Sequence, residues 1–228
     1  WYQQAANKGH PGAHFSIATM FERGEGLRKD LTEAQKWYGL AAELDVPEAM
    51  FDLGQRLLNG DGLPKDVNAA LNWLLRAAKA DIAPAQFATA QIYADEKGMN
   101  FNQTAATKWF AKAADNGVVD AYFTAGKRFD NAIGVKKDDQ AAVRYYTLAA
   151  GTDDAEAQYR LAVKLANGQG AKTDLSGAIV LYKEAALAGH ARAAMALGMV
   201  YASGIGAKKD IQLSADYFRI AAELGEAE

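Results

Sequence analysis

Few residues in this 228-residue sequence combine a type and a spacing that suit metal binding. His10 and His14 lie four residues apart, so they would project from one face of a helix. A stable zinc site needs further ligands, and the sequence has no cysteine to supply one. We therefore expect no metal site at this pair.

Glycine-rich and acidic segments give no stronger indication of catalysis. The Gly-Glu-Gly turn at residues 24–26 lacks the third glycine and the preceding strand of a dinucleotide-binding turn. The acid pairs at residues 138–139 and 153–154 fall at expected caps or turns. The sequence contains no Walker loop, no Gly-x-Ser-x-Gly elbow and no His-Glu-x-x-His helix. We predict a protein that is not an enzyme and binds no cofactor.

The composition disfavours two other classes of partner. A formal net charge of -3 gives no general attraction to nucleic acid or to an anionic membrane. No apolar stretch approaches the ~20 residues that a membrane span needs. Half of the residues are hydrophobic, which is ample for a buried core. The expected partner is a protein or peptide, with no nucleic acid and no membrane insertion of this segment.

The elements that must position any binding residue repeat every 36 positions. A large residue recurs at Trp1, Trp37, Trp73, Trp109, Tyr145, Leu181 and Tyr217. Alanine pairs follow each of these four positions later, and a glycine recurs at Gly26, Gly62, Gly98, Gly134, Gly170 and Gly206. Such a period is the signature of a solenoid, in which each unit packs mainly on its neighbours.

Each unit is expected to contain two helices. In the first unit, helix A covers about residues 11–22, and helix B runs from a cap at Asp30 to about Glu43. The cap recurs as Asp66, Asn102, Asp138, Asp174 and Asp210, all of them residue types that favour this position. Small residues recur in helix A at Ala18, Gly54, Ala90, Gly126, Ala162 and Gly198. They predict a close approach between helices, with the aromatic residues of helix B filling the wider gaps.

This pattern resembles the SEL-1-like repeat family, which is related to tetratricopeptide repeats. The sixth unit carries it in Ala193, Leu197, Gly198, Tyr201, Gly204, Gly206, Asp210, Tyr217, Phe218, Ala221 and Ala222. The resemblance implies an all-α, right-handed α/α superhelical solenoid, with the A helices on the concave side. It also implies protein–protein interaction, and an exported bacterial protein as the favoured localisation.

The period defines the expected organisation of the chain as one solenoid domain. Residues 1–9 form the end of a truncated repeat, and six full repeats cover residues 10–45, 46–81, 82–117, 118–153, 154–189 and 190–225. Residues 226–228 begin a further repeat, and the open ends favour end-to-end self-contacts. Glu96 and Ala132 replace the first glycine of the turn in the third and fourth units, so these two turns are expected to differ in shape.

Helix A residues outside the expected core positions form the candidate binding surface on the concave side. They are Arg23, Asp52, Gln55, Arg56, Asn59, Gln91, Asp95, Thr124, Lys127, Arg128, Asn131, Arg160, Lys164, Asn167 and Ser203. Short amides beside cations suit a peptide backbone or a terminal carboxylate. The basic centre is expected at Lys127, Arg128, Arg160 and Lys164. The alternative explanation is that any solvent-facing helix surface is polar.

The favoured function is a non-enzymatic scaffold that binds a protein or peptide partner on this surface. Solenoids suit this function because a rigid surface loses little freedom on binding. The alternative is a targeting or regulatory segment of a larger protein, with an anchor or a catalytic domain outside this chain.

Overall fold

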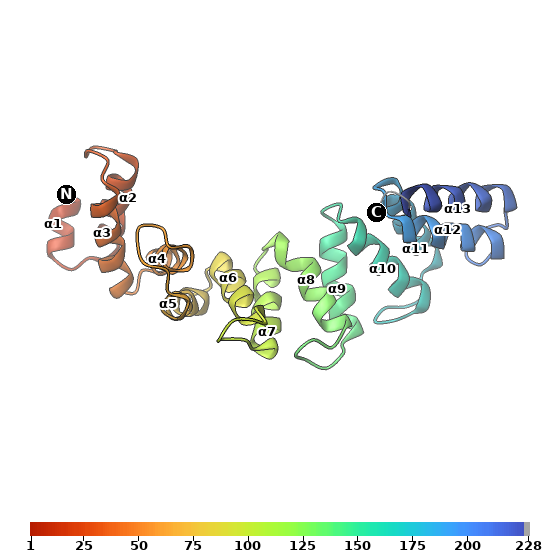
Figure 1. Cartoon of the computed structure of the whole chain (residues 1–228), viewed down its shortest axis with the longest axis horizontal. Coiled ribbons are helices and arrows are strands. Elements are labelled where there is room, and N and C mark those ends of the chain that lie inside the picture. Colours follow the sequence, from red (N-terminus) through yellow and green to blue (C-terminus); the bar gives the residue numbers. More distant parts are fainter. Residues whose placement is uncertain (226–228) are drawn as a thin grey trace. The chain divides into compact units, whose positions relative to one another are not determined.

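The structure, a computed structural model, describes residues 1–225, which contain helices and no strands (Figure 1). The helices are α1 (Tyr2–Asn7), α2 (Pro11–Arg23), α3 (Leu31–Glu43), α4 (Pro47–Asn59), α5 (Val67–Lys79), α6 (Ala83–Ala94), α7 (Gln103–Asp115), α8 (Val119–Asp130), α9 (Asp139–Ala150), α10 (Ala155–Asn167), α11 (Leu175–Leu187), α12 (Ala191–Ser203) and α13 (Ile211–Gly225). The even-numbered helices are the A helices of the six repeats, and the odd-numbered helices from α3 to α13 are the B helices. The repeated two-helix units form a solenoid, as predicted.

The chain divides into two compact units, Trp1–Val118 and Val119–Glu228. Within each unit, every helix packs against the next helix along the chain. The core of the first unit contains alanines of both helix types together with Tyr38 and Leu74. The second unit has cores around Tyr146 and around Leu197. The predicted start of a further repeat at residues 226–228 lies outside the described residues.

The predicted helix caps are confirmed at all six positions. Asp30 accepts hydrogen bonds from the backbone N–H groups of Thr32 and Glu33, at 3.0 and 3.1 Å. The side chains of Asp66, Asn102, Asp138, Asp174 and Asp210 accept equivalent bonds at the start of the following B helices. These carboxylates and the amide therefore satisfy N–H groups that have no partner within the helix.

The small residues of helix A permit close packing, as the sequence indicates. A Cβ atom added at Gly126 would lie 2.7 Å from Cδ1 of Tyr146, and one at Gly54 would lie 2.7 Å from Cγ of Leu74. Both distances are shorter than van der Waals contact. Glycine is therefore required at these positions because the side chain of the paired B helix rests directly on the backbone of helix A.

The two atypical turns behave differently from each other. In the third repeat, α6 ends at Ala94, and the next residue, Asp95, has an extended backbone in place of the left-handed glycine found after α4. The expected change of shape is therefore confirmed there. In the fourth repeat, Ala132 adopts φ of 57°, close to the 84° of the equivalent Gly60. That turn keeps its shape, so the expectation for it was wrong, and alanine adopts a conformation that favours glycine.

Candidate functional site

Two surface pockets, one in each unit, are lined mainly by A helices and the turns that follow them, and half of their lining positions are equivalent. The pocket of the second unit, about 300 Å³ in volume, is lined by Asp130, Lys137, Tyr159, Arg160, Val163, Lys164, Gln169 and Arg192. The pocket of the first unit, about 240 Å³ in volume, is lined by Leu58, Lys65, Val67, Gln91, Ile92, Asp95, Gly98 and Asn100. Residues 58, 65, 91 and 92 precede residues 130, 137, 163 and 164 by two repeat lengths. We call them the charged pocket and the apolar pocket.

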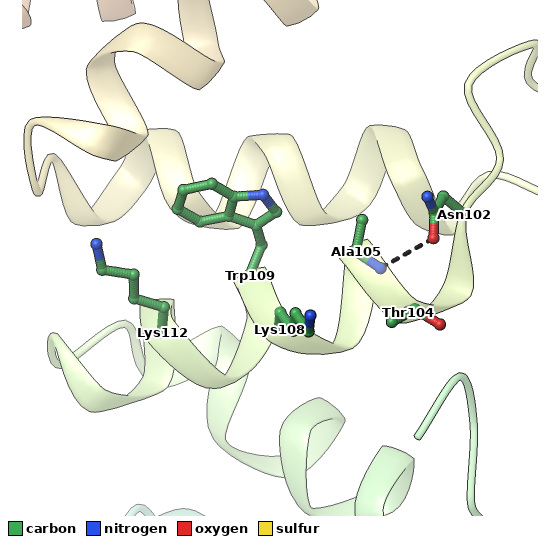
Figure 2. A pocket seen from close by; sticks show the side chains of 6 residues that line it. All are labelled: Asn102, Thr104, Ala105, Lys108, Trp109 and Lys112. Atoms are coloured by element: carbon green, nitrogen blue, oxygen red, sulfur yellow. Dashed lines mark hydrogen bonds between the residues drawn. The ribbon is translucent and has the colours of Figure 1, made fainter. Parts of the chain in front are cut away.

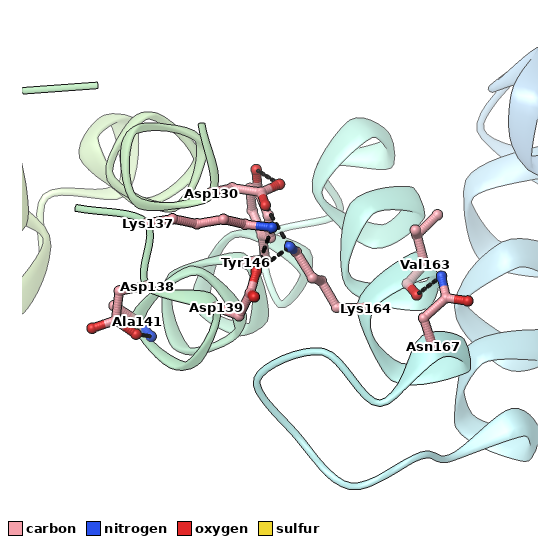
Figure 3. A network of polar contacts seen from close by, with 9 residues as sticks. All are labelled: Asp130, Lys137, Asp138, Asp139, Ala141, Tyr146, Val163, Lys164 and Asn167. Carbon is pink, nitrogen blue, oxygen red and sulfur yellow. Dashed lines mark hydrogen bonds and ion pairs between the residues drawn. The ribbon is translucent and has the colours of Figure 1, made fainter. Parts of the chain in front are cut away.

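A buried ion-pair network forms the floor of the charged pocket (Figure 3). Lys164 is 4% exposed, and its ammonium group donates to Asp130 and to Asp139, the latter at 2.6 Å. The Tyr146 hydroxyl donates to Asp130 at 3.2 Å, and Lys137 lies 3.3 Å from Asp139. The network connects α8, α9 and α10, so it fixes the fourth repeat against the fifth.

Three groups of this network, Lys164, Asp139 and Tyr146, have shifted pKa values. Burial alone would lower the pKa of Lys164, but the hydrogen bonds and charges of Asp130 and Asp139 raise it above the usual value. The same hydrogen bond from Lys164 lowers the pKa of Asp139. Burial and the neighbouring Asp130 carboxylate raise the pKa of Tyr146, which therefore remains a donor. Lys164 and Asp139 therefore remain charged at neutral pH and paired with each other.

A second set of contacts links the fifth repeat to the sixth. Arg160 donates through Nε to Glu156 at 2.6 Å, and Glu156 lies 2.7 Å from Nε2 of His190. Through Nδ1, His190 accepts a bond from the backbone N–H of Ala193 and so caps α12. Its ring stacks on Tyr159 with 4.6 Å between the ring centroids. Contacts with Glu156 and His190 therefore hold Arg160 and Tyr159 in place beside the charged pocket.

The first unit has a related network between its first and second repeats. Arg56 donates to Glu22 at 3.0 Å and to Asp52 at 2.6 Å, and the Tyr38 hydroxyl donates to Glu22 at 2.8 Å. Glu22, Tyr38 and Arg56 stand three repeat lengths before Asp130, Tyr146 and Lys164. The hydrogen bond from Asp52 outweighs burial and raises the pKa of Arg56. The same cation, carboxylate and tyrosine arrangement therefore recurs in the two units.

The predicted binding residues differ in their accessibility. The exposed ones are Arg23, Asn59, Gln91, Asp95, Lys127, Asn131, Asn167 and Ser203. The half-buried ones are Asp52, Gln55, Arg56, Thr124 and Arg160. Arg128 is 7% exposed and Lys164 is 4% exposed, so the expectation that both lie on an accessible basic surface was wrong. Burial lowers the pKa of Arg128, whereas Lys164 is occupied by two carboxylates.

The structure adds Lys137, Tyr159, Gln169 and Arg192 to the residues around Arg160 and Lys164. Sequence reasoning missed Lys137 and Gln169 because they lie in turns, and missed Tyr159 because its position matched the core residue Phe15. One signal for Arg192 was present in the sequence. It is basic, whereas the equivalent residues are Gly12, Glu48, Pro84, Asp120 and Glu156.

The B helices carry pockets of their own. One of about 390 Å³ is lined by residues of α7, including Trp109, with Nζ of Lys112 lying 5.6 Å from the ring centroid (Figure 2). Another of about 460 Å³ lies along α3 and includes Leu40, Leu53 and Leu63. Lys112 and Lys36 pair with Asp81 and Glu33, which do not line the pockets, so the pockets offer mainly apolar contacts.

The part of the chain that the structure describes contains neither a candidate metal site nor a helix that could span a membrane. No group of three His, Cys, Asp or Glu side chains there is placed to hold a metal ion. His14 is buried, and its Nδ1 lies 3.0 Å from the carbonyl oxygen of His10. Within residues 1–225, every helix is too short or too polar to cross a bilayer.

Comparison with known proteins places the repeats in one family. Residues 1–10, 11–46, 47–82, 83–118, 119–151, 155–190 and 191–226 match the Sel1 repeat. No curated protein sequence matches the chain.

Two solved structures resemble the chain. One is c5321, a protective antigen of uropathogenic Escherichia coli with an SLR fold, at 26% identity and a TM-score of 0.72. The match covers 100% of this chain and 49% of c5321, so the chain spans about half the length of that protein. The other is a Sel1 repeat protein from Oxalobacter formigenes, at 32% identity and a TM-score of 0.60, covering 92% of this chain and 84% of that one. The chain therefore belongs to the Sel1 repeat family.

Proposed function

We propose that this chain is a protein-interaction scaffold that binds a protein or peptide partner on the surface of its A helices. The observation that carries this proposal is the pair of pockets on that surface, one in each unit. They contain four of the residues singled out from sequence: Gln91, Asp95, Arg160 and Lys164.

The rigidity of the A helices supports the same function. Ion pairs between repeats, such as Glu22–Arg56 and Asp130–Lys164, hold neighbouring A helices in fixed positions. A preformed surface loses little conformational entropy when it binds a partner. Sel1 repeat proteins are generally protein-interaction scaffolds and generally non-catalytic.

The pockets of the B helices supply the competing surface. They are at least as large as those of the A helices, and apolar pockets of this kind also bind proteins. A test of the proposal must therefore compare the two surfaces directly.

Site-specific photo-cross-linking in the native extract makes this comparison. A photoreactive amino acid replaces Lys127 or Asn167, both exposed on A helices, or Gln140 or Lys183, both exposed on B helices. We expect adducts with the same protein from Lys127 and Asn167 and none from Gln140 and Lys183. All four positions are on the surface, so circular dichroism should show equal helix content. Adducts from the B positions alone, or from none of the four, contradict the proposal.

A further inference from the structure

Resting on the proposed function, we propose that the charged pocket binds a carboxylate of an acidic partner segment, whose neighbouring apolar side chains rest on Met195 and Met199. The segment is a peptide that combines aspartate or glutamate with residues such as leucine or phenylalanine. Nothing in the repeat pattern requires this chemistry, because the pocket of the first unit has Leu58 and Ile92 at the positions of Asp130 and Lys164.

The charge balance of the pocket favours one additional carboxylate. Lys137, Arg160, Lys164 and Arg192 line it, whereas the carboxylates that pair with these cations are Asp130, Asp139 and Glu156. Arg192 is exposed and forms no ion pair within residues 1–225. A guanidinium group presents a planar set of donors that matches a carboxylate in two-point contact.

Neutral groups at the pocket complete a site for a single carboxylate. The amide of Gln169 and the hydroxyl of Tyr159 are hydrogen-bond donors among the lining residues. One unpaired cation is too little for a nucleic-acid backbone, whose binding rests on the neutralisation of several phosphates. The net charge of -3 acts against a polyanion as well. The pocket therefore suits a protein carboxylate better than a nucleic acid.

The apolar part of the surface continues directly from Arg192. Met195 and Met199 follow it at three and seven residues, so the three side chains share one face of α12. Met195 is 49% exposed and Met199 is 54% exposed. Methionine side chains are flexible and polarisable, so they adapt to apolar residues of different shape. In the third repeat the equivalent residues are Pro84, Phe87 and Gln91, which lack this combination.

Fluorescence anisotropy with three labelled peptides tests both parts of the proposal on the whole chain. The probe is Glu-Asp-Leu-Phe-Asp-Leu with an amidated C-terminus. One control peptide replaces its carboxylates by amides, as Gln-Asn-Leu-Phe-Asn-Leu, and the other replaces its apolar residues by serine. We expect the probe to bind and each control peptide to bind at least ~10-fold more weakly, since each lacks one class of contact.

Protein variants locate the binding on the chain. Arg192→Ser is expected to weaken binding of the probe about 10-fold, because it removes the cation available to the carboxylate. The double substitution Met195→Ser and Met199→Ser should weaken it by a similar factor, about 10-fold, by removing the apolar contact. Lys208→Ser is the matched control, since Lys208 is an exposed cation in a turn outside the pocket. It should leave the affinity unchanged.

Three results overturn the inference: no binding of the probe, equal binding of its amide counterpart, or equal weakening by Arg192→Ser and Lys208→Ser. The cross-linking experiment separates this failure from failure of the proposed function. Adducts at Lys127 and Asn167 together with a negative peptide result leave the scaffold function standing and remove only the acidic partner. All variants lie at exposed positions, so unchanged circular dichroism spectra are expected.

Discussion

The apolar and charged pockets show two ways in which neighbouring repeats pack together at equivalent positions. In the first unit, Leu58 and Ile92 face the pocket between the second and third repeats. Two repeat lengths later, Asp130 and Lys164 occupy the same two positions between the fourth and fifth repeats and form an ion pair. Both pairs lie in α/α repeats of the same period, so the fold accommodates either an apolar pair or an ion pair at these positions.

The difference shows that the fold does not require charge at this position. An apolar pair contributes burial without a desolvation cost, whereas a buried ion pair must offset that cost through its hydrogen bonds. In the second unit, Asp139 and Tyr146 provide these bonds, where the first unit has Val67 and Leu74. The charged set, Asp130, Asp139, Tyr146 and Lys164, is therefore a coordinated feature of four positions.

We expect the largest effect on stability from a substitution of Lys164 alone, which removes the cation of the charged set. Lys164→Ile should lower the free energy of unfolding by about 3–5 kcal/mol, because it leaves buried Asp130 without its cation. The Asp130 side chain is only 14% exposed, so water compensates little. Urea denaturation followed by circular dichroism measures the loss.

A variant that carries the corresponding residues of the apolar pocket is the matched control. The quadruple variant Asp130→Leu, Asp139→Val, Tyr146→Leu and Lys164→Ile copies the first unit and should change the stability by no more than about 1 kcal/mol. A quadruple variant as unstable as Lys164→Ile would show that the two pockets are not equivalent.

The second effect concerns the glycines under the paired B-helix side chains. Gly126→Ala should destabilise by about 1–3 kcal/mol because the new methyl group overlaps Tyr146. Gly54→Ala should cost less, since Leu74 is more flexible than an aromatic ring. Thermal unfolding of both variants gives the ranking. Gly39→Ala, with open space around its Cβ position, is the control and should be slightly stabilising. Equal losses of stability in Gly54→Ala and Gly126→Ala would contradict the ranking.

A smaller effect is expected in the turns that lead into the two pockets. Ala132→Gly should stabilise the chain by about 1 kcal/mol, because a left-handed backbone strains alanine and not glycine. The reverse change at the equivalent position, Gly60→Ala, should destabilise by about the same amount, ~1 kcal/mol. Differential scanning calorimetry of the two variants checks the opposite signs, and shifts of the same sign would refute the assignment.

The smallest effect is a difference in acid sensitivity. The pKa of Asp139 is lowered from 3.8 by its hydrogen bond to Lys164, so its contribution to stability is present above pH 3.8 and is lost as the pH falls through the folded-state pKa. The quadruple variant lacks Asp139 and should lose stability less steeply below this pH. Urea midpoints measured between pH 7 and pH 3 make the comparison, and parallel curves would rule out this contribution.

The sequence by itself determined the two-helix pattern of the repeats. The 36-residue period, the cap residues and the turn glycines predicted helix A at 11–22 and helix B up to Glu43, and the structure has them at Pro11–Arg23 and Leu31–Glu43. These features act over a few residues, so the order of residue types is enough to reveal them. The requirement for glycine or alanine in helix A was visible for the same reason, since it recurs in phase.

Only the tertiary structure decided which polar residues are accessible. Arg128 and Lys164 stand at helical positions that look exposed, yet both are buried. The partners of Lys164 are Asp130 and Asp139, which lie 34 and 25 residues away in the preceding repeat. Periodicity within one helix shows which face of that helix is polar, but not whether a neighbouring repeat covers it. Burial between repeats depends on the side chains of both helices, and for this reason the pocket around Arg160 and Arg192 emerged only once the repeats were packed together.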